Sequence, residues 1–208
     1  MQMSTVNSSE PRRLPAYSFD PRMKFKSHDL NALVRELEEI LPNVLPNGVK
    51  AVVDLANFEL KVMTDPLKLK TALLNLVENA GDALSPGGSL ALSTSRIGFE
   101  GAFDGKSPYG AGGCALVSIS DTGTGMNETI RDKMFDPFFT TKPGKIGLGC
   151  TLAQRIVDCH NGRISVDSGT QRGTRIMVYL PLLKNDHTRE VPIPLPSSLS
   201  SVMARLRR

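Results

Sequence analysis

Apolar residues recur along this chain with two different periods. Alternating apolar positions, which are typical of strands with one buried face, predict strands at 90–92, 117–119, 164–166 and 176–180, with weaker candidates at 49–53 and 58–63. Helical spacing of apolar residues predicts three helices, at 30–41, 66–84 and 148–159. The predicted fold is therefore α+β, a two-layer α/β sandwich in which three helices cover one mixed sheet.

The helix predicted at 66–84 has one apolar and one polar face. Asp65 is placed to cap it, and Pro66 suits its first turn. Because residues three and four apart share a helix face, Asn75, Asn79 and Asp82 project together. The core-facing stripe is formed by Leu69, Leu73, Leu76, Ala80 and Leu84. Two amides and a carboxylate on the exposed face make a candidate ligand site.

Two glycine-rich segments follow. Asp121-Thr122-Gly123-Thr124-Gly125 comes directly after a strand-like run, so a carboxylate stands at a strand end where backbone can approach a ligand closely. Such a carboxylate can accept a hydrogen bond from an exocyclic amine, worth about 1.5–3 kcal/mol, although a tight Asp-Gly turn is the plain alternative. The second segment, 144–149, opens the helix at 148–159, where free amides and the helix dipole favour phosphate.

Taken in order with Phe135-Asp136-Pro137-Phe138-Phe139, these segments resemble the catalytic, ATP-binding domain of sensor histidine kinases, part of the superfamily that includes gyrase-type ATPases, Hsp90 and MutL. The resemblance covers about residues 29–183, and Gly173-Thr174 looks like the last glycine motif of the family. It implies a Bergerat-type nucleotide-binding fold, with a mobile lid at 126–146 that covers bound ATP.

The resemblance also implies roles for single residues. Asn79 would offer an amide oxygen to Mg²⁺, which keeps several waters and is shared with substrate phosphates. Asp121 would accept a hydrogen bond from the adenine amino group, supported by the hydroxyl of Thr174. Lys142 would reach the terminal phosphate. The other nucleotide-binding residues implied are Asp82, Gly123, Gly125, Thr141, Gly147, Leu148 and Gly149.

Asn75 stands where hydrolytic members of the superfamily have a glutamate that activates water. An amide is a poor general base, so the resemblance implies that ATP is held for transfer to another nucleophile rather than hydrolysed. Glu78 either reaches the same region or lies on a solvated helix surface; the sequence leaves both open.

The chain departs from the family pattern in the second glycine segment. Lys145 replaces a usual glycine, Ile146 a usual threonine or serine, and Cys150 a usual leucine. Lys145 either adds a phosphate contact or stiffens the loop. The pair Phe138-Phe139 is either a hydrophobic latch for the lid or core filling.

The family carries its phosphate acceptor, a histidine, on a two-helix dimerisation domain. His28-Asp29 opens a predicted helix where Asp29 suits a cap, and His160 lies at a helix end. His187 lies in a polar tail. Residues 1–27 are too few for two long helices, so we expect the acceptor domain to be absent from this chain. The implied partners are that dimerisation domain and a response regulator receiver domain; the fragment would be monomeric and its parent a homodimer.

The length and composition of the chain limit the number of domains that it can form. A chain of 208 residues, 40% hydrophobic and 22% charged, can bury one core, which predicts one domain at 28–183 between a flexible or remnant linker, 1–27, and a flexible tail, 184–208. The glycine-rich segment 98–113 is expected to be a long flexible loop. A net charge of +4 is modest, so we expect no direct nucleic-acid contact.

No apolar run has the length of a membrane span, and the start lacks the apolar core of a signal peptide. Cys114, Cys150 and Cys159 lack metal-ligand spacing, which favours reduced thiols in a cytoplasmic protein, whose parent can still be membrane-anchored.

The predicted function is binding of Mg²⁺-ATP and donation of its terminal phosphate to a histidine of the absent dimerisation domain, for onward transfer to a response regulator in two-component signalling. Two alternatives stay open. One is an ATP-free adaptor or phosphotransfer scaffold of the same fold, and the other is a serine kinase of the anti-sigma-factor type. The intact Asn79, Asp121 and glycine motifs argue against the adaptor, and the run 135–142 is more typical of a histidine kinase.

Overall fold

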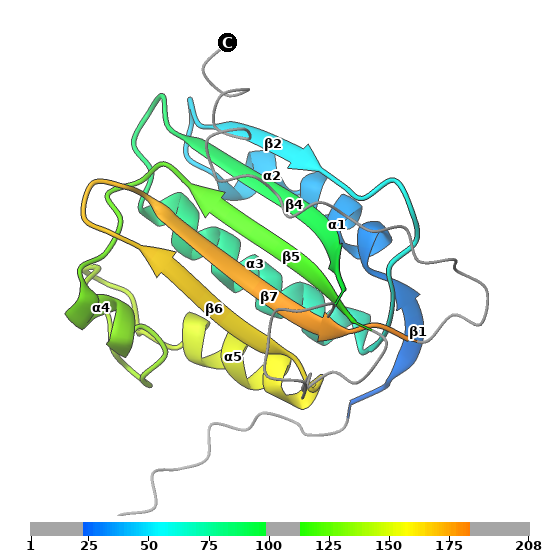
Figure 1. Cartoon of the computed structure of the whole chain (residues 1–208). Helices are drawn as coiled ribbons and strands as arrows, with labels where there is room; N and C mark the ends of the chain where they lie inside the picture. Colours follow the sequence, from blue (N-terminus) through cyan, green and yellow to red (C-terminus); the bar gives the residue numbers. More distant parts are fainter. Residues whose placement is uncertain (1–22, 99–112, 184–208) are drawn as a thin grey trace, which may run out of the picture.

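The computed structural model describes residues 23–98 and 113–183, which form two layers (Figure 1). One layer is a five-stranded sheet of order β2-β4-β5-β7-β6. Its strands are β2 (Lys50–Asp54), β4 (Ser89–Ile97), β5 (Cys114–Asp121), β6 (Arg163–Ser168) and β7 (Thr174–Pro181). Only the β2–β4 pair is parallel, so the sheet is mixed, as predicted.

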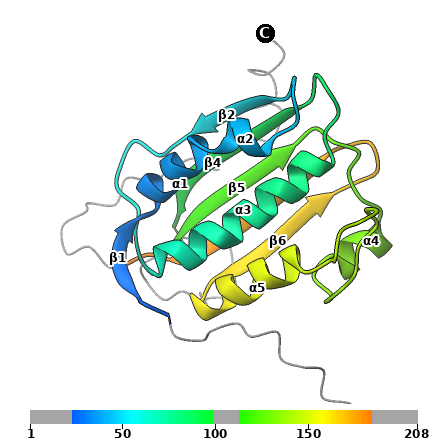
Figure 2. The same cartoon turned by 180° about the vertical axis from the view of Figure 1, so that it is seen from behind.

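The other layer is helical. The helices are α1 (Leu30–Glu38), α2 (Leu41–Val44), α3 (Pro66–Asp82), α4 (Glu128–Lys133) and α5 (Gly149–Cys159). Figure 2 shows α1, α3 and α5 on one face of the sheet, with α3 in the middle. At one end, β1 (Lys26–Asp29) and β3 (Lys61–Thr64) form a small antiparallel sheet. The predicted α+β sandwich of one mixed sheet and three covering helices is confirmed.

Helix α3 forms as its sequence predicts. Asp65 caps it by accepting a hydrogen bond from the backbone N–H of Lys68 at 3.2 Å, and Pro66 occupies the first turn. The predicted apolar stripe is buried, and burial of each leucine stabilises the fold by about 1.5–3 kcal/mol. Packing of this stripe on the sheet fixes the rotation of α3 and so directs its polar face toward the lid.

Strand β5 ends at Asp121, the carboxylate that the sequence predicts to bind a ligand. All its residues are buried, and β4 and β7 flank it on its two edges. Its last residue, Asp121, pairs in register with Thr174, the first residue of β7. The sheet therefore places these two residues side by side below the end of α3.

The first predicted helix is wrong in its length. It ends at Glu38, and a separate short helix, α2, follows. Pro42 explains the break, because its nitrogen has no N–H to continue the first helix, whereas in the first turn of α2 that donor is not needed. The expected cap is confirmed: the Asp29 side chain accepts from the backbone N–H of Asn31 at 3.1 Å.

Other differences lie at element ends. The sequence did not predict β1, which begins two residues before the expected boundary at 28, nor α4, which forms within the expected lid. The predicted strand at 58–63 is shorter and later, at Lys61–Thr64. The tail at 184–208, residues 1–22 of the expected linker, and 99–112 of the expected loop lie outside the described residues. Among the helices that the structure describes, none is long and apolar enough to cross a membrane.

Candidate functional site

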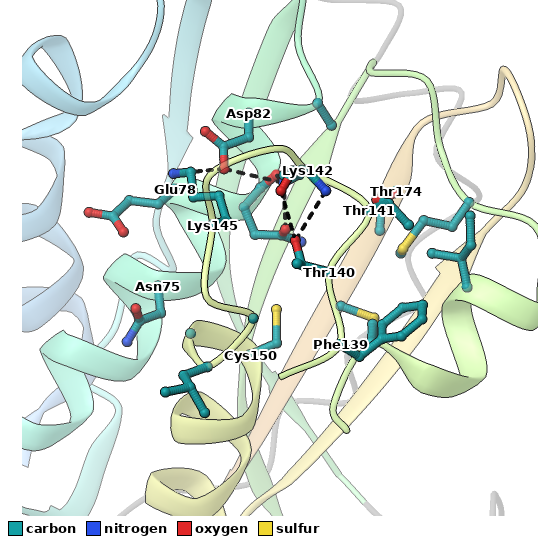
Figure 3. A pocket seen from close by; sticks show the side chains of 18 of the residues that line it. Asn75, Glu78, Asp82, Phe139, Thr140, Thr141, Lys142, Lys145, Cys150 and Thr174 are labelled. Carbon is teal, nitrogen blue, oxygen red and sulfur yellow. Dashed lines mark hydrogen bonds and ion pairs between the residues drawn. The ribbon is translucent and has the colours of Figure 1, made fainter. Parts of the chain in front are cut away.

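A cavity of about 680 Å³ lies between α3, the segment 124–150 and the start of β7. Figure 3 shows the side chains that surround it. Every predicted site residue lines this cavity except Gly123. The predicted residues that line it are Asn75, Asn79, Asp82, Asp121, Gly125, Thr141, Lys142, Gly147, Leu148, Gly149 and Thr174.

Asp121 forms the buried end of the cavity. Its Oδ1 accepts hydrogen bonds from the backbone N–H groups of Gly123, at 2.8 Å, and Thr174, at 3.2 Å. The residue is 4% exposed, and burial raises the pKa of its carboxyl above the usual range, although both N–H donors and the charge of Lys142 act in the opposite direction. Both backbone donors use Oδ1, so within the described part of the chain the other carboxylate oxygen is left as an acceptor for a ligand.

Thr174 supports Asp121 through its backbone. Its hydroxyl lies 2.9 Å from the Ser168 hydroxyl, and its support for Asp121 is the backbone N–H. Ser168 also accepts from the backbone N–H of Met126 at 2.9 Å. This hydroxyl pair therefore ties the start of the lid to the strands β6 and β7.

Glycine is required at the base of the cavity. Gly125 and Gly173 have φ angles of +65° and +74°, which side chains rarely adopt. A Cβ at Gly125 would collide with the carbonyl oxygen of Gly169, and one at Gly173 with that of Asp121. The backbone at Gly125 therefore packs directly against that of Gly169, and the backbone at Gly173 packs against that of Asp121.

A lysine from the lid occupies the other end. The ammonium of Lys142 donates to Asn79 Oδ1 at 2.6 Å and to the Asn79 carbonyl oxygen at 3.0 Å, and it pairs with Asp82 Oδ2 at 3.3 Å. These oxygens therefore bind a cationic group. Amide and carboxylate oxygens are also the ligands that Mg²⁺ prefers.

The described residues hold no cluster of three or more histidine, cysteine, aspartate or glutamate side chains that could cage a metal. A magnesium ion at Asn79 would therefore need oxygens from a bound phosphate and water. The donor set fits an ion shared with a substrate, and it fits no ion held by protein alone.

Asn75 lies one turn before Asn79 on α3. Its Nδ2 donates to the Thr71 carbonyl oxygen at 3.0 Å, which fixes the amide orientation. A Cβ added to Gly149 would lie 3.2 Å from Asn75 Oδ1, so this oxygen faces the start of α5. Glu78 also lines the cavity and is exposed, so both of its predicted interpretations stay open.

Helix α5 begins at the glycine-rich loop. Its N-cap residue, Leu148, makes no side-chain capping hydrogen bond. The amides of the first turn therefore keep their donors for an anion, and the helix dipole favours negative charge there. Cys150 lies in this turn, and burial raises the pKa of its thiol.

Sequence reasoning missed the apolar wall of the cavity, which comes from Met126, Ile130, Met134 and Phe139. The first three are four residues apart and lie on or beside α4, so helical spacing within the expected lid was the available signal. The neighbouring Phe138 is 49% exposed, which is inconsistent with core filling.

The two described histidines lie away from the cavity. His160 caps the end of α5 and is buried: its Nε2 accepts from the backbone N–H of Asp65 at 3.0 Å, and Nδ1 lies 2.7 Å from the Ile156 carbonyl oxygen. His28 lies in β1, with a buried Nε2 that has no hydrogen-bond partner among the described residues. The predicted position of His160 at a helix end is confirmed.

Comparison with known families identifies the family of the chain's central part. Residues 64–184 match the model of a family described as histidine kinase-, DNA gyrase B-, and HSP90-like ATPases. The matched range includes α3, β5, the lid, α5 and β7, and thus every residue that lines the cavity.

Similar curated proteins are kinases. The signal transduction histidine-protein kinase AtoS of Escherichia coli K12 is 34% identical over 175 residues, which cover 82% of this chain and 26% of AtoS. Sporulation kinase B of Bacillus subtilis is 29% identical over 154 residues, covering 74% of this chain and 33% of the kinase. The chain therefore spans only a quarter to a third of these relatives.

Solved structures share the fold. The mycobacterial sensor histidine kinase MprB has a TM-score of 0.61 at 26% identity, over 76% of this chain and 98% of that one. The histidine kinase ThkA, solved in complex with the response regulator protein TrrA, has a TM-score of 0.56 at 26% identity, over 76% of this chain and 42% of that one.

Proposed function

The chain belongs to the family of histidine kinase-, DNA gyrase B- and HSP90-like ATPases, and from this premise we propose that it is the part of a histidine kinase that binds Mg²⁺-ATP and donates the terminal phosphate. The acceptor is a histidine on a dimerisation domain outside this chain, and a response regulator receives the phosphate next. The membership itself makes the chain an ATPase domain of the kind that histidine kinases use in two-component signalling.

One observation carries the proposal. A single cavity brings together a buried carboxylate, Asp121, a cation-binding amide, Asn79, and an uncapped helix start at Gly149. These groups match the three parts of Mg²⁺-ATP in chemistry. The carboxylate suits the adenine amine, the amide oxygen suits a hard cation, and the free amides suit phosphate.

At the adenine end, the free oxygen of Asp121 accepts from the exocyclic amine. The Gly123 and Thr174 N–H groups hold the carboxylate in place, and Met126, Ile130 and Met134 supply the apolar surface that the purine ring covers. Guanine presents a carbonyl oxygen where adenine has its amine, so it would face the carboxylate with an acceptor. The site is thus selective for adenine.

At the phosphate end, Lys142 leaves Asn79 when nucleotide enters and contacts the terminal phosphate. Bound Mg²⁺ supplies positive charge that offsets the phosphate oxygens. Asn79 contributes its oxygen to that ion, while the backbone of Gly147, Leu148 and Gly149 surrounds the phosphates together with Thr141 and Asp82. In the transfer, an imidazole nitrogen of the acceptor bonds to phosphorus as the P–O bond to the leaving ADP breaks.

Asn75 makes transfer to a partner, rather than to water, the favoured reaction. Its amide is fixed by the hydrogen bond to the Thr71 carbonyl oxygen and faces the start of α5. It has no proton affinity near neutral pH, so it cannot remove a proton from an attacking water. ATP bound here therefore persists until the acceptor histidine arrives.

The exposed Phe138 is the part of the lid that meets the acceptor domain. Its φ angle of 66° lies in the left-handed region, which is uncommon for a residue with a side chain, and Ile146 nearby in sequence is also exposed. This favours the latch interpretation of the phenylalanine pair. We also propose that the domain spans 28–183, that this fragment is monomeric, and that its parent is a homodimer that acts in the cytoplasm.

Label transfer tests the function. The chain is incubated with ATP labelled on its terminal phosphate, Mg²⁺ and a separately produced two-helix dimerisation domain of a histidine kinase, with a histidine-to-glutamine version of that domain as control. We expect label on the histidine domain, stable to base and lost in acid. Acid-stable label on serine would instead identify the serine kinase. A folded chain that binds no nucleotide would identify the adaptor.

A further inference from the structure

Two lysines of the lid converge on one carboxylate at the mouth of the cavity. Asp82 Oδ2 lies 3.3 Å from Lys142 Nζ and 3.1 Å from Lys145 Nζ. Figure 3 shows both lysine side chains reaching from the lid toward Asp82. One carboxylate neutralises one ammonium, so the second ammonium is a positive charge without a full counter-charge, unless an anion joins it.

The charges around the cavity make this second lysine important. Within the described chain, the charged side chains that line the cavity are Glu78, Asp82 and Asp121 against Lys142 and Lys145. Asp121 lies at the adenine end, so without Lys145 the two carboxylates of Glu78 and Asp82 would face Lys142 alone at the phosphate end. Such a site would repel a triphosphate, since like charges at close range disfavour binding. The positive charge of Lys145 thus offsets the negative charges of Asp82 and Glu78 at the phosphate end of the cavity.

The two lysines are held differently. Lys142 is 29% exposed and has three oxygen contacts, on Asn79 and Asp82. Lys145 is 55% exposed, and its contact with Asp82 is the one interaction of its side chain among the described residues. An exposed ion pair of this kind contributes little stability, about 0–1 kcal/mol. Lys145 can therefore exchange Asp82 for another anion at small cost.

We propose that Lys145 is a phosphate-binding residue, which leaves Asp82 for an outer phosphate of the nucleotide when ATP enters. The inference rests on the proposed ATP-binding function. It settles the two interpretations of Lys145 that the sequence leaves open in favour of the phosphate contact. Asp82 is then a holding site that keeps both ammonium groups at the cavity mouth while no nucleotide is bound.

The matched variants are Lys145→Gln, which removes the charge, and Lys145→Arg, which keeps it. Lys133→Gln is the control for net charge, because Lys133 is exposed on α4 in the same lid and does not line the cavity. Affinity for a non-hydrolysable ATP analogue with Mg²⁺ is measured by calorimetry, and affinity for AMP by chemical-shift titration.

We expect Lys145→Gln to weaken binding of the ATP analogue by about three- to tenfold, with AMP affinity unchanged and the loss reduced in high salt. Lys145→Arg and Lys133→Gln should leave the affinity for the analogue close to that of the wild type. An equal loss of affinity for AMP and for the ATP analogue in Lys145→Gln would show that the Lys145–Asp82 pair only holds the lid, and would overturn the inference. So would an unchanged affinity in Lys145→Gln. A wild-type chain that binds no ATP analogue would instead overturn the proposed function itself.

Discussion

Replacement of Asp121 by asparagine separates binding from stability at one buried position. The new amide oxygen can still accept from the backbone N–H groups of Gly123 and Thr174, as Oδ1 does now. The other atom becomes an NH₂ donor, which faces the donor amine of adenine. A charge-assisted hydrogen bond of about 1.5–3 kcal/mol is lost, so the dissociation constant for ATP should rise about tenfold or more.

The free energy of unfolding should stay the same or rise, although the affinity for ATP falls. Burial raises the pKa of Asp121 in the folded chain above its unfolded value, so ionisation of this carboxyl at neutral pH disfavours the folded state. Removal of the charge should therefore leave the melting temperature of the ligand-free chain unchanged or higher. For the same reason, ATP affinity of the wild-type chain should fall as the pH decreases through the raised pKa of Asp121, while the variant shows no such step.

Calorimetric titration with a non-hydrolysable ATP analogue and thermal unfolding without ligand provide the two readouts. An unchanged affinity for the ATP analogue in Asp121→Asn would show that Asp121 does not contact adenine. A variant that melts far below the wild type would show instead that the ionised carboxylate is needed for the fold, and would refute the reasoning from burial.

Three further substitutions test other parts of the site. Asn79→Ala should reduce affinity in Mg²⁺ to the level seen without Mg²⁺, with little change in the ligand-free melting temperature; a large drop in that temperature would show a structural role. Asn75→Glu should raise the rate of ATP hydrolysis about tenfold or more, because it introduces a general base, whereas Asn75→Gln should not; equal rates in both would contradict the assigned role. Gly125→Ala should lower the free energy of unfolding by about 2 kcal/mol or more through backbone strain and collision with the Gly169 carbonyl. The control is Gly144→Ala, which has a similar φ of +76° but open space around it, and should cost less in chemical denaturation.

The sequence predicted best what depends on local signals. Helix α3 carries a cap, a first-turn proline and an unbroken apolar stripe, so its buried face and its polar face both followed from spacing. Asp121 was located because a strand-like run ends at it and glycines follow. In both cases, the chemistry and the local structure lie within about ten residues of each other.

Contacts across long sequence distances could not be predicted in this way. The Lys142 side chain contacts Asn79, and the Lys145 side chain contacts Asp82, because the lid folds back over α3. No local sequence pattern predicts this path of the chain. The backbone support of Asp121 by Thr174 depends on the register between β5 and β7. Strand β1 was not predicted, because its hydrogen bonds come from β3, which lies more than thirty residues later in the chain.

The central claim is a magnesium-dependent adenine nucleotide site in the cavity between α3 and the lid. The most direct test is calorimetric titration of the wild-type chain with a non-hydrolysable ATP analogue, with Mg²⁺ and with a chelator in its place. The account predicts binding at one site that tightens when Mg²⁺ is present. A folded chain that shows no binding heat in either condition, confirmed by unchanged melting temperature, would contradict it.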